Sequence, residues 1–139
     1  MDIPSALIEI QIARGTILHS TMFQNIDHGK FFVIVGVSKD YVAGFFFINS
    51  RVNIHIEDKQ AQLDMQYPLR KKDYSFLHHD SFLCATKIEK IERSRLAETI
   101  NSGITTIIGS MKDEHMEELL EKARESILFS KIQKKQFLY

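Results

Sequence analysis

Positively charged side chains gather in one stretch of an otherwise balanced sequence, and cations are what a phosphate group requires. The 139 residues include 18 Lys and Arg and 18 Asp and Glu. The formal net charge is −2 over residues 1–68, +3 over residues 69–95 and −1 over residues 96–139. In the positive stretch Arg70, Lys71 and Lys72 are consecutive in an expected loop, where contacts with phosphate form easily. The neutral average therefore excludes a strong general nucleic-acid binder and leaves room for a local phosphate site.

Three other groups have side chains suited to catalysis or metal binding, and each has a plainer interpretation. Residues 78–80, a His-His-Asp run, could hold a metal, but neighbours in a strand point to opposite faces, which favours an exposed polar turn. His55 and Glu57 could act as base and acid, although a surface polar pair is the simpler interpretation. Cys84 lies in an apolar run with no sequence neighbour to activate its thiol, which indicates core packing rather than a nucleophile. We expect neither a metal nor a cofactor.

Five phenylalanines in two runs could form a platform on which nucleobases stack. The runs are Phe31-Phe32 and Phe45-Phe46-Phe47, and their neighbours are Val, Ile and Gly rather than basic residues. Burial in a core or a subunit interface is therefore the favoured interpretation. Because both faces of these strands are apolar, whereas a small barrel has one interior, the excess of apolar surface predicts a homodimer.

The elements that must position these groups begin as short strands. The predicted strands are residues 16–23, 31–38, 42–49, 52–56, 62–66, 81–86 and 87–91. The second and third are almost uniformly apolar and form a hairpin that must be covered on both faces. Six or seven mostly antiparallel strands with short turns predict a small β-barrel or a strongly coiled sheet, since closure or coiling removes exposed edges.

From residue 92 onward the composition changes to helix formers and charge. A helix over residues 92–101 would end near Gly103, where glycine can adopt the left-handed conformation of a cap. A longer helix is expected to start with Ser110 as its N-cap. Its predicted apolar stripe consists of Met116, Leu119, Leu120, Ala123 and Ile127. Residues 131–139 form a basic tail, in which we expect residues 131–136 to fray and residues 137–139 to be either docked or loose.

These patterns together predict one α+β domain over residues 1–139, with a barrel over about 13–91 and a helical part over about 92–130. The single cysteine excludes an internal disulfide. The longest apolar runs have seven residues, whereas a helix needs about 20 to cross a bilayer. An acid, Asp2, stands where a signal peptide carries positive charge. We therefore expect a cytoplasmic protein with no membrane contact.

Several segments also occur in a familiar order. Residues 13–18 (ARGTIL) open a first strand, a loop ends in Gly29-Lys30, and a later apolar strand closes with Asn49-Ser50. Residues 80–91 (DSFLCATKIEKI) form a Cys-containing strand ahead of two helices. In this order the chain resembles the MazF/PemK-like toxins of bacterial toxin–antitoxin pairs. The likeness covers about residues 13–128 and lies in pattern more than in identity.

The resemblance implies an SH3-like barrel with C-terminal helices, a homodimer, an antitoxin or other protein partner, and metal-independent cleavage of single-stranded RNA. In that reaction the 2′-hydroxyl attacks its own phosphodiester, and the enzyme supplies a base, an acid and cationic cover for the phosphate. Carried over by position, Lys30 replaces the family's phosphate-binding Arg, and Phe31 replaces the Pro after it. Ser50 takes the place of the Thr or Ser that helps to bind the phosphate.

The resemblance therefore implies a catalytic set of Lys30 and Ser50, with His28 or His19 as general acid or base. The implied RNA-binding residues are Arg51, Arg70, Lys71 and Lys72. Some family members carry an Arg-x-Asp pair on the strand of the Cys, where this chain has Leu83 and Ala85. Two interpretations stay open: an RNA-binding protein with endoribonuclease activity, or a non-catalytic SH3-like protein-interaction module that has kept the fold and lost the nuclease site.

Overall fold

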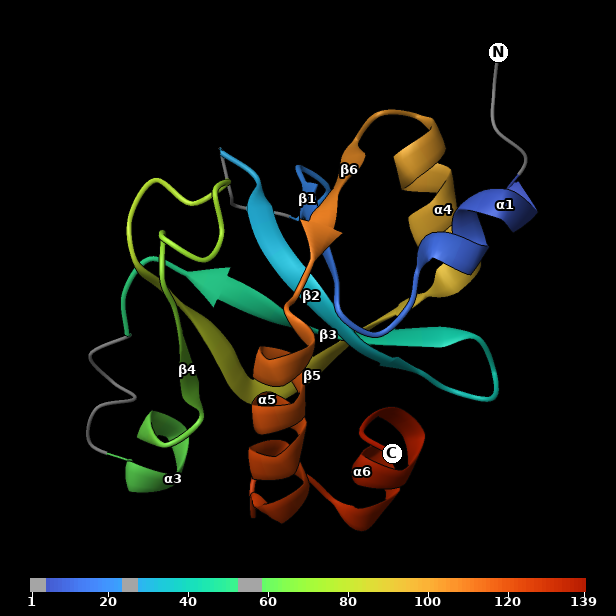
Figure 1. Ribbon diagram of the computed structural model, residues 1–139. Coiled ribbons are helices and arrows are strands. Elements are labelled where there is room, and N and C mark those ends of the chain that lie inside the picture. Colours follow the sequence, from blue (N-terminus) through green and yellow to red (C-terminus); the bar gives the residue numbers. More distant parts are fainter. Residues whose placement is uncertain (1–4, 24–27, 53–58) are drawn as a thin grey trace.

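The computed structural model describes residues 5–23, 28–52 and 59–139 of an α+β protein (Figure 1). Its elements are α1 (Ser5–Gln11), β1 (Thr16–Ser20), β2 (Lys30–Val37), β3 (Val42–Asn49), α3 (Gln60–Leu63), β4 (Gln66–Leu69), β5 (Ser81–Glu92), α4 (Arg93–Asn101), β6 (Thr105–Ser110), α5 (Asp113–Glu125) and α6 (Lys131–Phe137). The strand predicted over residues 52–56, with His55 and Glu57, lies almost wholly outside the described residues. Within the described ranges, no helix has the length and apolarity that crossing a bilayer requires.

Six strands form one antiparallel sheet in the order β4-β5-β3-β2-β1-β6. The prediction of a mostly antiparallel α+β fold is confirmed. The closed barrel is wrong, because the described part of the sheet ends in two edge strands, β4 and β6, instead of joining them. Short edges make closure unnecessary: β4 has four residues and contains Pro68, which cannot donate a ladder hydrogen bond. The sheet stays open and twists strongly between its edges (Figure 1).

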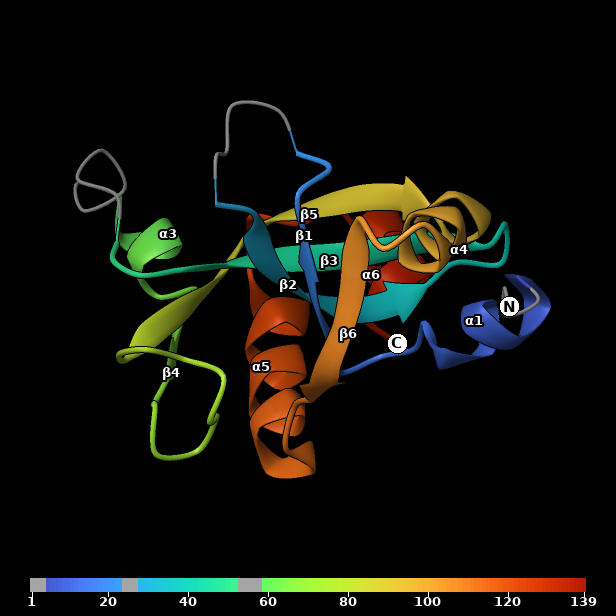
Figure 2. The same cartoon turned by 90° about the horizontal axis from the view of Figure 1, so that it is seen from above.

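Successive residues of β1, β2 and β3 point alternately into two apolar cores. The first core joins one face of the sheet to α5 and α6. Its members include Ile17, Val33, Val35, Phe46, Ile48, Met116, Leu119, Leu120, Ala123, Phe137 and Leu138. The second core joins the other face to α1 and α4. Its members include Ile8, Ile12, Leu18, Phe32, Ile34, Phe45, Leu96 and Ala97. The strands accordingly lie between α4 and α6 (Figure 1, Figure 2).

This double coverage explains the apolar hairpin. Phe32, Phe45 and Phe46 are each at most 3% exposed, which confirms the expected packing for these three. Phe31 and Phe47 are only partly buried, and Phe31 lines a cavity. The excess of apolar surface from which we predicted a homodimer is covered by helices of the same chain. The homodimer stays a prediction, but the apolar faces of the hairpin no longer support it, because helices of the same chain cover them.

Two glycines allow α6 to lie directly on the hairpin. Gly36 and Gly44 are paired across β2 and β3. A Cβ added at Gly36 would lie 2.0 Å from the carbonyl oxygen of Phe137, and one at Gly44 would lie 2.6 Å from the ring of Phe137. Arg14 fastens the same segment, since its Nε donates to the Val35 carbonyl at 2.7 Å and its Nη2 to the Phe137 carbonyl at 3.1 Å. The prediction that residues 131–136 fray is therefore wrong, and of the two alternatives for the last residues, Phe137 and Leu138 follow the docked one.

The remaining predicted elements differ in how well the structure matches them. The hairpin and the helix before Gly103 are confirmed, and Gly103 has a φ of +85°. The segments predicted over residues 81–86 and 87–91 are both extended and form one continuous strand, β5. The strand over residues 62–66 is wrong, because α3 occupies its first half. Ser110 ends the unforeseen strand β6, and Lys112 stands at the N-cap of α5. Ile127, 87% exposed, lies beyond the end of α5 and outside its buried stripe.

Candidate functional site

A cavity of about 260 Å³ lies where the hairpin ends and β5 begins. The register that pairs Asn49 of β3 with Phe82 of β5 brings these chain segments to one end of the sheet. The residues lining the cavity are Gly29, Lys30, Phe31, Ile48, Ser50, Phe76, Leu77, His78, His79 and Ser81. Lys30 and Ser50, the two residues that the resemblance assigns to phosphate binding, thus share one hollow although 20 positions separate them in sequence.

The Lys30 side chain is held in place by two neighbours on β3. Its Nζ donates a hydrogen bond to the Asn49 side-chain oxygen and lies 5.6 Å from the centre of the Phe47 ring. Burial lowers the pKa of Lys30 below its usual range, and nearby Cys84 opposes this shift in part. The ammonium has therefore already lost part of its hydration, which reduces the cost of replacing water by an anion.

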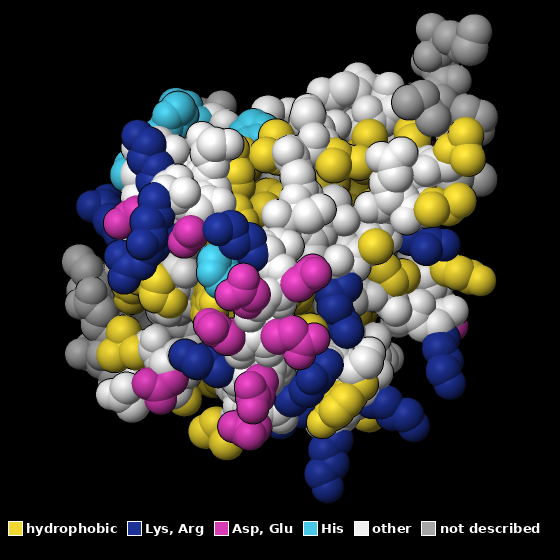
Figure 3. Space-filling model, in the orientation of Figure 1, with side chains coloured by type: hydrophobic (Ala, Val, Ile, Leu, Met, Phe, Trp, Pro, Cys, Tyr) yellow, Lys and Arg dark blue, Asp and Glu magenta, His cyan; other side chains and the backbone are white. Residues whose placement is uncertain are grey.

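The loop between β4 and β5, residues 70–80, lines the cavity with residues 76–79 and carries three cations at its beginning, outside the lining; we call it the basic loop. Its exposed basic side chains are Arg70, Lys71, Lys72, His78 and His79. The Asp80 carboxylate accepts a hydrogen bond of 2.8 Å from the backbone N–H of Lys71, which ties the beginning of the loop to its end. Figure 3 shows Lys and Arg side chains beside His side chains over this end of the molecule, at the upper left. The basic loop thus extends the positive charge of Lys30 outward.

The basic loop is anchored on the first turn of α5. The Tyr74 hydroxyl accepts a hydrogen bond of 3.1 Å from the backbone N–H of Lys112 and lies 2.7 Å from Nδ1 of His115. The tautomer of His115 decides which of these two atoms donates in the second hydrogen bond. Burial raises the pKa of Tyr74. A salt bridge of 3.1 Å joins Lys112 to Asp73 and lowers the pKa of that carboxyl. The loop is therefore positioned by α5.

The other predicted site residues stand apart from the cavity lining. His28 is exposed in the turn before β2, and its carbonyl accepts a hydrogen bond of 3.2 Å from Nε2 of His19. The His19 ring packs on Phe31, with 4.6 Å between ring centres. Arg51 is exposed and follows Ser50 directly. Among the described residues that line the cavity, none of His28, His19 and Arg51 occurs.

Sequence reasoning missed the contribution of residues 78–81. They are the exposed polar turn that we expected, and β5 begins at Ser81. The argument that adjacent histidines diverge holds for a strand, but His78 and His79 lie in a bend, and both line the cavity. Antiparallel pairing of the hairpin with the Cys-containing strand would have revealed them, because it places the start of β5 beside the end of β3. Cys84 itself is half-buried, near Gln66 and Thr86.

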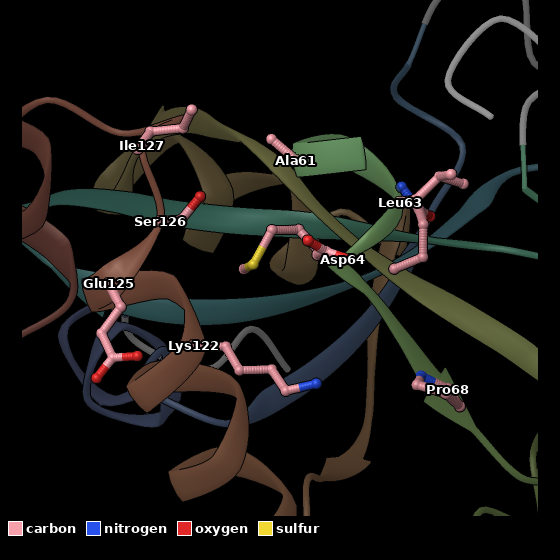
Figure 4. A pocket seen from close by; sticks show the side chains of 10 residues that line it. Ala61, Leu63, Asp64, Pro68, Lys122, Glu125, Ser126 and Ile127 are labelled. Carbon is pink, nitrogen blue, oxygen red and sulfur yellow. The ribbon is translucent and has the colours of Figure 1, made fainter. Parts of the chain in front are cut away.

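A larger pocket of about 720 Å³ lies on another part of the surface, between α3, the start of β4 and the end of α5. Figure 4 shows Lys122, Glu125, Ser126 and Ile127 on one side of it, facing Ala61, Leu63, Asp64 and Pro68. Its lining contains none of the predicted site residues. The smaller cavity at Lys30 and Ser50 is therefore the candidate functional site.

Comparison with known proteins adds no assignment. No family model and no curated protein matches the chain. The resemblance to the MazF/PemK-like toxins stays a prediction from the sequence, and the function has to be argued from the cavity and the basic loop.

Proposed function

We propose that the protein binds single-stranded RNA at the Lys30–Ser50 cavity and cleaves it as an endoribonuclease. The observation that carries this proposal is the meeting of Lys30 and Ser50 in one hollow, next to a loop with three exposed cations. A partly dehydrated ammonium and a hydroxyl are a suitable pair for a phosphodiester. The size of the hollow, about 260 Å³, suits a single nucleotide rather than a duplex.

In the proposed reaction Lys30 offsets the charge of the scissile phosphate and Ser50 donates a hydrogen bond to it. Arg51, Arg70, Lys71 and Lys72 contact the flanking backbone. The 2′-hydroxyl attacks the adjacent phosphorus, and the products are a 2′,3′-cyclic phosphate and a 5′-hydroxyl end. An SH3-like arrangement of the strands, a homodimer, an antitoxin partner and a cytoplasmic setting belong to the same proposal, since the resemblance implies them together.

The test is cleavage of a long single-stranded RNA by the purified protein in the presence of a chelator. We expect the wild-type protein to cleave, and Lys30→Ala and Ser50→Ala each to lower the rate by about 10²–10³, the usual effect of removing one group that stabilises developing charge. Lys39→Ala is the matched control, because Lys39 is an exposed lysine at the opposite end of the hairpin. It should retain the wild-type rate.

Each other outcome has a definite meaning. If the wild-type protein leaves the RNA intact, the nuclease part of the proposal is wrong. If it binds the RNA without cleaving it, RNA binding remains as the function. Cleavage that survives both substitutions would show that the reaction takes place elsewhere. Absence of both binding and cleavage would favour the protein-interaction module. Such a module would need a surface other than the apolar strands, which lie inside the two cores.

A further inference from the structure

The His79 ring has one nitrogen engaged and one free to exchange a proton. Its Nδ1 lies 3.2 Å from the backbone carbonyl of Asp80 and 3.4 Å from Oγ of Ser81. The Ser81 hydroxyl donates to the backbone carbonyl of His79 at 3.1 Å, so its hydrogen is already used. Because a carbonyl can only accept, Nδ1 must carry the ring hydrogen. In the neutral ring, Nε2 is then left as a basic lone pair.

This ring belongs to the cavity that holds the proposed phosphate-binding groups. His79, His78, Lys30 and Ser50 all line this cavity, whose volume is about 260 Å³. Both histidines are exposed, so an imidazolium formed there remains solvated. Two hydrogen bonds tie the local turn. The Asp80 carboxylate accepts from the Lys71 N–H, and the Ser81 hydroxyl donates to the backbone carbonyl of His79.

The other described histidines are less suited to this role. His19 donates through Nε2 to a backbone carbonyl and packs on Phe31. His115 is engaged through Nδ1 in a hydrogen bond with the Tyr74 hydroxyl, at the base of the basic loop. His28 is exposed but does not belong to the cavity lining. Of the histidines that the structure describes, His78 and His79 are the pair that the fold delivers to the cavity.

We infer that His79 is the general base and His78 the general acid of the cleavage, an inference that rests on the proposed function. Nε2 of His79 takes the proton from the 2′-hydroxyl while O2′ forms its bond to phosphorus. The bond from phosphorus to O5′ breaks, and protonated His78 gives its proton to O5′. One imidazole gains a proton and the other loses one, and exchange with solvent restores both.

The experiment compares His79→Ala, His78→Ala and His28→Ala in single-turnover cleavage of RNA across pH, with Lys39→Ala as the neutral control. We expect His79→Ala and His78→Ala each to lower the rate by about 10²–10⁴, the usual contribution of a positioned acid or base. A base must be deprotonated to act, so the wild-type rate rises with pH on the acid side of its profile. His79→Ala should flatten that rise, and His78→Ala should flatten the fall on the alkaline side.

A second measurement separates proton transfer from binding and folding. Affinity for a 2′-O-methyl RNA, which cannot be cleaved, should change less than about threefold in His79→Ala, because the phosphate contacts of Lys30 and Ser50 remain. In nitrogen NMR of the wild-type protein, the His79 ring should show its hydrogen on Nδ1, and the 2′-O-methyl RNA should shift the Nε2 signal.

The possible failures can be told apart. A wild-type protein that neither binds nor cleaves RNA overturns the proposed function and this inference together. A wild-type protein that cleaves, with a His79→Ala variant of equal rate and unchanged pH profile, overturns the inference and leaves the function standing. Loss of the acid-side rise in His28→Ala instead of His79→Ala would assign the base to the residue that the sequence first suggested.

Discussion

Lys30 differs from the other cations of the proposed RNA site in its environment. Arg51, Arg70, Lys71 and Lys72 are exposed, whereas Lys30 is half-buried against Phe47 and hydrogen-bonded to Asn49. Exposed cations contribute long-range attraction that salt screens within about 10 Å. A half-buried cation instead contributes a directed contact, whose strength depends on its protonation. A lysine in place of the arginine that the resemblance predicts at this position would therefore change how binding responds to pH, as well as the number of donors.

Affinity for RNA should fall at alkaline pH because Lys30 loses its proton there. Burial lowers the pKa of Lys30, so the ammonium is lost at a pH below that of an exposed lysine, about 10.4. Since phosphate binds the charged form, affinity should drop roughly tenfold as pH rises through the lowered pKa. The measurement is fluorescence anisotropy with a 2′-O-methyl oligocytidine, which is not cleaved and does not titrate in this range.

Lys30→Arg supplies the decisive comparison, because a guanidinium stays charged throughout. This variant should lose the alkaline drop, whereas Lys39→Arg at an exposed position should keep the wild-type profile. An alkaline drop that persists in Lys30→Arg would mean that another group titrates.

At the scale of elements, the basic loop depends on contacts with α5 that no local pattern predicts. Tyr74 and Asp73 belong to the loop, and their partners Lys112 and His115 come about 40 residues later. Surface ion pairs such as Lys112 with Asp73 contribute little to stability by themselves. The hydroxyl of the buried Tyr74, which takes part in two hydrogen bonds, is therefore expected to matter more.

Tyr74→Phe should loosen the basic loop without disturbing the core. Phenylalanine fills the same space but leaves the Lys112 N–H and His115 Nδ1 without their partner, which costs about 1–2 kcal/mol of unfolding free energy. Urea unfolding measures the loss, and hydrogen exchange should show faster exchange of the Lys112 amide. Tyr41→Phe is the control, because Tyr41 is 63% exposed. Slow exchange at Lys112 in Tyr74→Phe would contradict the proposed anchoring.

Elements with a strong local pattern could be predicted from the sequence, and those that depend on distant partners could not. The apolar hairpin, β5 and α4 have continuous or periodic patterns, which are sufficient to place them. Strand β6 has the sequence TTIIGS and becomes a strand by pairing with β1, almost 90 residues earlier. In the same way Lys30 and Ser50 were predicted through the resemblance, from their places at the start of one apolar strand and just after the end of the next. His79 required the pairing of β3 with β5.

At the scale of the whole molecule, one sheet is covered on both faces by helices from opposite ends of the chain. Helices α1 and α4 cover one face, and α5 and α6 cover the other. The hairpin at the centre therefore has no free apolar face, and a homodimer must use a different surface. This arrangement also holds the β2–β3 end of the cavity still, since the strands that carry Lys30 and Ser50 are packed on both sides. The integrity of the site thus depends on α6, although α6 contributes no residue to it.

Gly36→Ala should detach α6 and destabilise the whole protein. The added Cβ would lie 2.0 Å from the carbonyl oxygen of Phe137, and backbone cannot yield as a flexible side chain does. We expect a loss of about 1–3 kcal/mol of unfolding free energy, as for other overpacked cores, with faster hydrogen exchange throughout α6. Gly109→Ala in β6 is the matched control, because a Cβ there meets no atom within 4 Å, and its effect should stay within about 0.5 kcal/mol. Equal unfolding free energies for the two variants would show that the last helix does not pack on the hairpin, and the argument that α6 steadies the site would fall with it.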